Sequence, residues 1–238
     1  MILSLDKVTK SYGALKVADA ISFAVPRGEA LGIIGPNGAG KSTLFNLITG
    51  NVRADGGTIL LGGRDVTRLP AMARVRLGIG RSFQIPQPFE KLTVFENLLT
   101  AAAFGRGLPE GEVQDGCAEI LEQTGLLRRA NVPAGGLTLL ERKRLELARA
   151  LATGPELLLL DEIAGGLTEA ESHALVATIR AINAQGTTII WIEHVLHALT
   201  RVVTRLVVLD FGRVIATGAP DEVMASKAVH QIYLGLEA

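Results

Sequence analysis

The sequence lacks paired cysteines, a surplus of either charge and any long apolar run, and each absence excludes a class of protein. Cys117 is the only cysteine among the 238 residues, so an internal disulfide and a cysteine-rich metal site are excluded, and a reducing, cytosolic location is expected. The 24 Lys and Arg residues balance 24 Asp and Glu residues. Because nucleic-acid-binding proteins usually carry a basic excess, this balance argues against a nucleic-acid partner.

Signals for secretion and for membrane crossing are also missing. No stretch approaches the roughly 20 apolar residues that span a bilayer. Residues 1–10 carry Asp6 and Lys7 where a signal peptide has its apolar core. We therefore expect any work at a membrane to depend on a partner protein. The length allows one sizeable α/β domain with room for a subdomain.

The chain is organised around the phosphate-binding pattern G-x-x-x-x-G-K-S, which follows an apolar run ending at Ile34. The run predicts a buried strand, and residues 42–48 predict a helix that Gly50 ends. Glycines let the loop turn tightly, and N–H groups of the loop and of the helix N-terminus then point at the phosphates. Lys41 can reach the terminal phosphates, and the Ser42 hydroxyl can hold Mg²⁺. The predicted nucleotide-binding residues are Gly35, Pro36, Asn37, Gly38, Ala39, Gly40, Lys41, Ser42 and Thr43.

Two further apolar runs end in residues that carry chemistry. Residues 157–160 predict a buried strand that ends in Asp161 and Glu162, and residues 187–192 predict another that ends in Glu193 and His194. Ligands of open α/β sheets bind at the carboxyl ends of strands. In a P-loop protein, Asp161 is placed to order Mg²⁺, and Glu162 is placed to orient or deprotonate the attacking water. His194 shares the predicted edge, which favours a functional role over a structural one.

Strand and helix signals surround this core. Apolar residues on both sides of Ser11-Tyr12-Gly13 predict two strands joined by a turn, where Tyr12 is either a base-stacking residue or a surface tyrosine. A hairpin is predicted at residues 206–217, and a helix at 169–185. Residues 93–153 are expected to be mostly helical, and short helices are expected at 220–226 and 228–234.

The last helix of the 93–153 segment has two features of its own. Thr138 and Glu141 have the spacing of a capping box, so Thr138 is the predicted N-cap. Arg142, Lys143, Arg144 and Arg149 give this helix a basic flank, which is expected to be solvated.

The order of P-loop, Gln84, a signature segment at Leu137, the pair Asp161-Glu162 and His194 resembles the ATPase subunit of ATP-binding-cassette (ABC) transporters. The resemblance covers the whole chain. It implies an α/β P-loop NTPase core of the RecA type, an N-terminal antiparallel β subdomain and an α-helical subdomain. The implied division is a core with the β subdomain at 1–84 and 154–238, and a helical subdomain at 85–153.

Within that family, three stretches resemble the subunits that serve uptake of branched-chain amino acids. They are residues 81–84 with 91–99, residues 192–194, and residues 233–235. A cassette for lipopolysaccharide export has a similar C-terminus and remains an alternative. A soluble ABC protein without a transport role and a regulatory protein that does not turn over ATP are two more. The first lacks support because coiled-coil insertions and a second cassette are absent, and Glu162 argues against the second.

The resemblance also implies roles for residues outside the P-loop. Tyr12 would stack on adenine, Gln84 would sense Mg²⁺ and the attacking water, and Thr138 would contact nucleotide as part of the signature segment. Asp161 would support Mg²⁺, Glu162 would be the general base, and His194 would contact the γ-phosphate. The implied cofactors are ATP and Mg²⁺.

The implied partners are membrane permease subunits, a second ATPase subunit and, indirectly, an external solute-binding protein. The implied place is the cytoplasmic face of the cell membrane. Gly166, Leu167 and Thr168 would cross to the second ATPase subunit. Residues 84–95 would pass motion to the permease, with Ile85, Phe89 and Leu92 as either a docking surface or core.

The chain departs from the family pattern at two places. The usual signature is Leu-Ser-Gly-Gly-Gln, whereas residues 137–141 read Leu-Thr-Leu-Leu-Glu. Leu140 replaces a glycine whose backbone comes close to the γ-phosphate held by the opposite subunit, so its side chain would crowd that approach. Ile163 stands where proline is usual. We hypothesise an asymmetric pairing in which this chain's signature segment is weak and its own P-loop site is complete.

Overall fold

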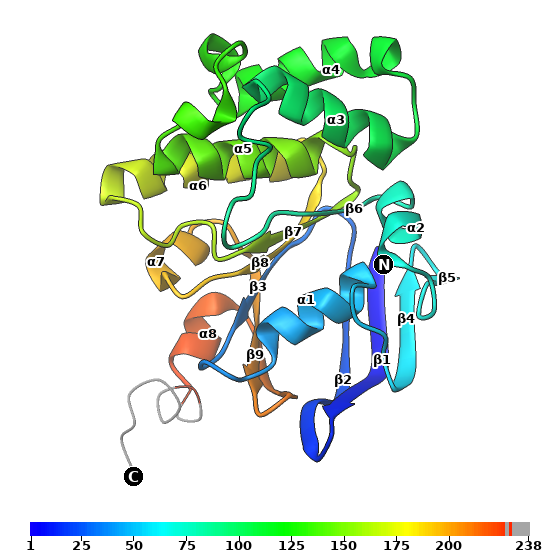
Figure 1. Ribbon diagram of the computed structural model, residues 1–238. Coiled ribbons are helices and arrows are strands. Elements are labelled where there is room, and N and C mark those ends of the chain that lie inside the picture. Colours follow the sequence, from blue (N-terminus) through cyan, green and yellow to red (C-terminus); the bar gives the residue numbers. More distant parts are fainter. Residues whose placement is uncertain (227–228, 230–238) are drawn as a thin grey trace.

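The computed structural model describes residues 1–226 and residue 229, and two β-sheets form its framework. The larger sheet has six strands in the order β10-β9-β3-β8-β7-β6, and all of them are parallel except β10 at one edge (Figure 1). The smaller sheet is antiparallel, with the order β2-β1-β4-β5. The strand bounds are β1 Leu3–Tyr12, β2 Leu15–Val25, β3 Ala30–Ile34, β4 Gly56–Leu61, β5 Arg64–Asp65, β6 Ile79–Arg81, β7 Leu157–Asp161, β8 Thr188–Ile192, β9 Arg205–Asp210 and β10 Arg213–Gly218.

Helix α1 (Lys41–Thr49) lies between the two sheets (Figure 1). Its apolar residues Leu44, Phe45 and Ile48 share one buried cluster with residues of β1, β2 and β4 and with one face of the parallel sheet. The helix begins directly after the glycine-rich loop and ends at Gly50, whose left-handed φ of 79° closes the last turn. Both the strand before the loop and the helix after it are therefore as predicted, and both are buried.

The remaining helices cover the other face of the parallel sheet and form a separate layer beyond it. Helices α6 (Glu169–Ala184) and α7 (Leu196–Leu199) pack directly on that face, and α5 (Leu139–Ala152) joins them through Leu147 and Leu151. The opposite side of α5 packs against α3 (Val94–Arg106) and α4 (Glu110–Gln123) around a second core that includes Leu98 and Leu145. Figure 1 shows α3 and α4 as the outermost layer above α5. The short elements are α2 Ala71–Arg76, α8 Pro220–Met224 and the 3₁₀ turns Leu127–Arg129 and Ala134–Gly136.

The apolar runs correctly predict the strands that hold the site, and the structure adds several short elements. Helix α2, strand β6 and helix α7 are missing from the sequence expectations because each has six residues or fewer and shows no clear periodicity. The expected helix at 228–234 and the segment 233–235 lie outside the described residues. The subdomain boundaries at residues 84 and 154 stay a prediction.

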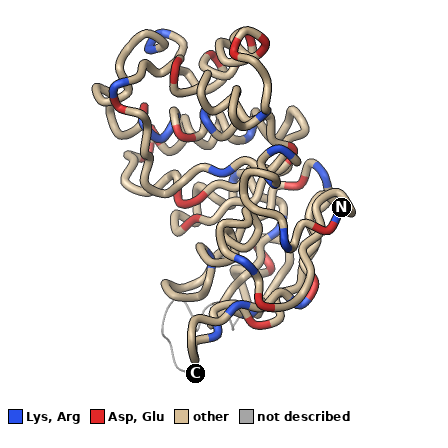
Figure 2. The backbone as a smooth tube through the Cα atoms, turned by 45° about the vertical axis from the view of Figure 1, so that its right-hand side comes forward, with Lys and Arg blue, Asp and Glu red and all other residues tan. Residues whose placement is uncertain are grey.

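The prediction that the basic flank of α5 is exposed to solvent is wrong. Lys143 is 5% exposed, and Arg142, Arg144 and Arg149 are half-buried. The flank is partly covered because α5 packs against the sheet on one side and against the outer helices on the other. Across the described residues, Figure 2 shows Lys and Arg interspersed with Asp and Glu. No helix in the described ranges is both long and apolar enough to span a bilayer.

Candidate active site

The glycine-rich loop joins the end of β3 to α1, and its glycines are required by close backbone contacts. A Cβ atom at Gly35 would collide with the carbonyl oxygen of Leu209, and one at Gly40 would collide with that of Val17. Gly38 and Gly40 also have left-handed φ values of 83° and 98°. The loop is therefore held between the β9–β10 hairpin and β2, at the N-terminus of α1, where N–H groups can face an anion.

Lys41 is folded over this loop. Its Nζ donates hydrogen bonds to the carbonyl oxygens of Gly35 and Pro36, at 2.7 and 2.9 Å. Burial lowers the pKa of Lys41, and the nearby carboxylates of Glu162 and Asp161 partly oppose that shift. The ammonium group is therefore positioned at the loop, where a terminal phosphate would be its natural partner.

Three predicted catalytic side chains meet beyond the ends of β7 and β8. His194 Nε2 lies 2.9 Å from Glu162 Oε1, and Gln84 Nε2 donates to Glu162 Oε2 at 2.5 Å. Glu162 has a left-handed φ of 47°, which turns the chain sharply as it leaves β7. β8 lies between β3 and β7 in the sheet, so the loop and both strand ends share one edge. The geometry is that of a base held beside a histidine and an amide, next to a phosphate loop.

The predicted Mg²⁺ ligands Ser42, Gln84 and Asp161 line one cavity of about 420 Å³. Their hydroxyl, amide and carboxylate oxygens are the hard donors that Mg²⁺ prefers, and it usually takes one or two carboxylates with substrate phosphates completing the shell. The described residues contain no cluster of three or more His, Cys, Asp and Glu side chains that could hold a metal without substrate. The donor set therefore fits Mg²⁺ bound together with a nucleotide.

Two predicted binding residues lie apart from these contacts. Tyr12 ends β1 with 51% of its surface exposed, and Lys10 Nζ lies 5.4 Å from its ring centre. Thr138 is confirmed as the N-cap of α5, since it accepts from the backbone N–H of Glu141 and the Glu141 carboxylate reaches back to it. Among the described hydrogen bonds, none links either residue to the P-loop. Their contact with nucleotide stays a prediction.

Comparison with known proteins assigns the family. The model of the ABC transporter family matches residues 18–165, which is more than half of the chain. The chain belongs to this family. It is an ATPase subunit of the ABC transporter type, and the predicted architecture of P-loop core, antiparallel β-sheet and helical layer is confirmed.

Relatives and solved structures agree with that assignment over the full length. The chain is 36% identical to the high-affinity branched-chain amino acid transport ATP-binding protein LivG of Salmonella typhimurium, covering 98% of both chains. It is 33% identical to the lipopolysaccharide export system ATP-binding protein LptB of Haemophilus influenzae, covering 98% of this chain and 97% of that protein.

The ADP conformation of MJ1267, an ATP-binding cassette of an ABC transporter, superposes with a TM-score of 0.90 at 32% identity over 99% of both chains. A dimeric post-hydrolysis state of the cassette MJ0796, bound to ADP and Pi, has a TM-score of 0.82 at 25% identity over 92% of this chain and 98% of that one.

Sequence reasoning missed a buried acid that joins two loops of this cassette. Glu193 is 1% exposed, and one of its oxygens accepts from the N–H of Ala164 at 2.7 Å. Its other oxygen accepts from the N–H groups of His194 and Val195, at 2.9 and 3.2 Å. The loop after Glu162 is therefore tied to the loop that carries His194. Only its place directly before His194 could have drawn attention to it.

Helix α5 contributes further contacts that the sequence did not reveal. Lys143 Nζ lies 3.5 Å from the carbonyl oxygen of Glu162, and burial lowers the pKa of Lys143 while Glu193 and Glu162 oppose the shift. One turn along α5, burial raises the pKa of Glu146, and the nearby Arg149 side chain and backbone N–H groups of Phe83 and Gln87 oppose that shift. These charges hold the loops on both sides of the catalytic group.

Proposed function

We propose that this ABC ATPase powers the import of branched-chain amino acids or of a related small polar solute. The supporting observation is the full-length similarity to LivG proteins at 36% identity, with nothing of note left over on either chain. The proposed partners are permease subunits in the membrane, a second ATPase subunit and an external solute-binding protein. The proposed place is the cytoplasmic face of the membrane, reached through the permease.

For hydrolysis, the loop N–H groups and Lys41 would bind the phosphates, and Glu162 would accept a proton from the attacking water. His194 and Gln84 flank Glu162 within hydrogen-bond distance, so they would fix its carboxylate and position the water in line. Ser42, Gln84 and Asp161 would hold Mg²⁺, which when bound neutralises charge on the phosphate oxygens. Most of the rate would come from positioning and charge stabilisation.

The signature segment supports a proposal about the ATPase partner. Leu140 is half-buried at the start of α5, and Leu139 is 49% exposed next to the Gly166 loop. Branched side chains at both positions would limit how closely a second subunit's nucleotide approaches the backbone here. We therefore propose pairing with an ATPase chain whose signature segment is intact, which would give one fully active site and one poor one.

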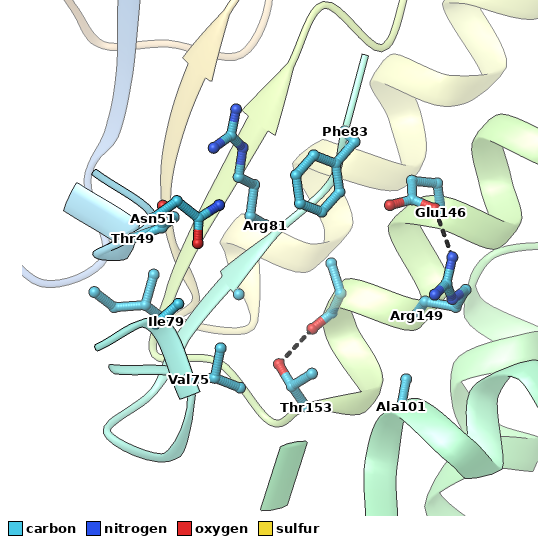
Figure 3. A pocket seen from close by; sticks show the side chains of 13 residues that line it. Thr49, Asn51, Val75, Ile79, Arg81, Phe83, Ala101, Glu146, Arg149 and Thr153 are labelled. Carbon is cyan, nitrogen blue, oxygen red and sulfur yellow. Dashed lines mark hydrogen bonds and ion pairs between the residues drawn. The ribbon is translucent and has the colours of Figure 1, made fainter. Parts of the chain in front are cut away.

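The segment after Gln84 is suited to contact the permease. Ile85 is 70% exposed and Phe89 is 50% exposed, which favours a docking surface over core, whereas Leu92 is half-buried. Figure 3 shows the adjoining pocket of about 200 Å³, with Phe83 and the Glu146–Arg149 pair facing Ile79 and Val75 across it. An apolar rim beside a pocket would accommodate an apolar side chain from a loop of another protein.

Uptake measurements test the substrate. In the native host, deletion of the gene should abolish high-affinity uptake of radiolabelled leucine, isoleucine and valine. The wild-type gene should restore it, whereas the Glu162→Gln variant should not. Unchanged leucine uptake together with accumulation of lipopolysaccharide at the inner membrane would favour the export alternative, which the 33% identity to LptB supports.

Gel filtration tests the partner. The Glu162→Gln variant should bind ATP with little hydrolysis, so any closed dimer would persist. We expect this chain alone to remain monomeric with ATP and to elute as a dimer once the partner chain is added. Conversion to a homodimer by ATP alone would contradict the asymmetric pairing.

A further inference from the structure

Arg81 places a guanidinium group on the carboxylate proposed to support Mg²⁺. Arg81 Nη2 lies 2.7 Å from Asp161 Oδ2, and the two side chains are 9% and 7% exposed. The pair joins neighbouring strands, because Arg81 ends β6 and Asp161 ends β7. The ion pair is therefore almost completely shielded from water, in contrast to the many exposed pairs on the surface.

Arg81 has further contacts through Nη1 and the faces of two aromatic rings, whereas its buried Nε has no hydrogen-bond partner among the described residues. Its Nη1 donates to Asn46 Oδ1 at 2.6 Å, which ties it to α1. The guanidinium carbon lies 5.5 Å from the ring centre of Phe45 and 4.9 Å from that of Phe83. In Figure 3 the side chain projects from β6 beside Phe83. The group is thus held in one place and does not swing freely as a surface arginine would.

This fixed cation lines the same cavity as the proposed metal ligands. The cavity of about 420 Å³ is bounded by Ser42, Gln84 and Asp161, and also by Arg81. Asp161 is the only carboxylate among those proposed ligands, and one of its oxygens is already bound to Arg81. A divalent cation that approaches Asp161 must therefore share this carboxylate with a positive charge a few ångströms away.

We propose that Arg81 stands in for the divalent cation at Asp161 and weakens Mg²⁺ binding by competing for that carboxylate. Without nucleotide, the guanidinium neutralises a carboxylate that would otherwise be buried and unpaired. When nucleotide phosphates arrive, their charge makes cation binding favourable despite Arg81. Arg81 would thereby limit the gain in nucleotide affinity that Mg²⁺ brings. This inference rests on the proposed role of Asp161 at the metal site.

The test compares ADP affinity with and without Mg²⁺, so it needs no turnover. The ADP dissociation constant is measured by calorimetry in EDTA and in saturating Mg²⁺. The constant in EDTA divided by the constant in Mg²⁺ gives a ratio that reports how much Mg²⁺ strengthens nucleotide binding. Arg81→Gln removes the charge but keeps a hydrogen-bond donor for Asp161. We expect this ratio to rise about tenfold in that variant, because replacing a residue that hydrogen-bonds to a metal ligand alters metal affinity by roughly 10- to 100-fold.

Arg81→Lys is the matched control. It keeps the positive charge but loses the hydrogen bond from Nη1 to Asn46. We expect its ratio to stay within about threefold of wild type. If Arg81→Gln does not fold, Arg81→Lys alone decides: a raised ratio would show that charge is not the cause, and a ratio near wild type supports the charge of Arg81 as the cause.

The outcomes separate the inference from the function on which it rests. An unchanged or lower ratio in a folded Arg81→Gln variant overturns the competition by Arg81 and leaves the metal site standing. A wild-type ADP affinity that does not respond to Mg²⁺ overturns the proposed metal site, and with it the inference.

Discussion

Replacing Glu193 by Gln should uncouple the loop that carries Glu162 from the loop that carries His194. The Glu193 carboxylate receives three backbone N–H groups, one from Ala164 and two from residues 194 and 195. In Glu193→Gln an amide NH₂ group replaces one oxygen, so at least one of these N–H groups loses its acceptor. The variant also loses the charge that faces the buried Lys143.

The size of the effect follows from these contacts. An unsatisfied buried N–H group costs about 1–3 kcal/mol. For a chain of this length, a loss of about 2 kcal/mol lowers the Tm by roughly 4–8 °C. Glu193 is buried behind the strand end and is not a predicted nucleotide contact, so the KM for ATP should change little. Small displacements of catalytic groups can cost up to about 100-fold in rate, and we expect kcat to fall by roughly 10- to 100-fold.

Glu29→Gln is the control, because Glu29 lies directly before β3, at the opposite end of the same sheet. It forms an ion pair with Arg205, at 2.8 Å, with 13% of its side chain exposed. This variant should lose stability without losing kcat. Scanning fluorimetry gives the Tm, and phosphate release gives kcat and KM. If Glu193→Gln lowers the Tm but leaves kcat at the Glu29→Gln level, then Glu193 is structural only and the coupling of the two loops is refuted.

Three further predictions concern binding, turnover and stability. Tyr12→Ala should weaken ATP binding by about 5- to 150-fold, which is the contribution of one base–aromatic stack, while Tyr12→Phe should bind normally. Equal affinities of Tyr12→Ala and wild type in a fluorescent-nucleotide assay would show that Tyr12 does not stack on the base. Leu140→Gly should raise ATP turnover of the paired enzyme, and no change or a fall would count against the crowding argument. Arg129 holds the pKa of Glu141 at about 2, so this pair stabilises the fold above the ordinary pKa near 4.5 and ceases to do so as the pH falls toward 2. Thermal melts at pH 5 and pH 3 should therefore show a larger loss for wild type than for Arg129→Ala, and parallel losses would show that the pair contributes nothing.

The core of the site could be predicted from sequence because its residues sit at the ends of short, wholly apolar runs. Each run forms a buried parallel strand, and the residue after each run is placed by the strand itself. The runs therefore predict that Lys41, Glu162 and His194 lie along one edge of the sheet. Which strands are neighbours cannot be predicted from the runs, and it is the order β3-β8-β7 that brings Glu162 and His194 to 2.9 Å.

Residues that act through a neighbour could not be predicted, since their role depends on which way a charged side chain points. Arg142, Lys143 and Arg144 are alike in sequence, yet only Lys143 is fully buried. Arg81 stands beside Phe83 and Gln84 in the chain, but its partner Asp161 lies 80 positions away. Pairing between distant charges leaves no local pattern, whereas apolar periodicity does.

Two charged side chains of α5 lie next to the segments that carry Glu162 and Gln84. Lys143 and Glu146 are three positions apart and so lie on the same face of the helix. Lys143 contacts the backbone carbonyl of Glu162, and Glu146 faces the backbone N–H of Phe83, which lies next to Gln84 in the chain. A rotation of α5 would therefore move the ends of both segments together, because neither contact can follow the helix without its loop. Since α5 also begins with the signature residues, a partner subunit that contacted Thr138 would act on the same helix whose Lys143 contacts Glu162.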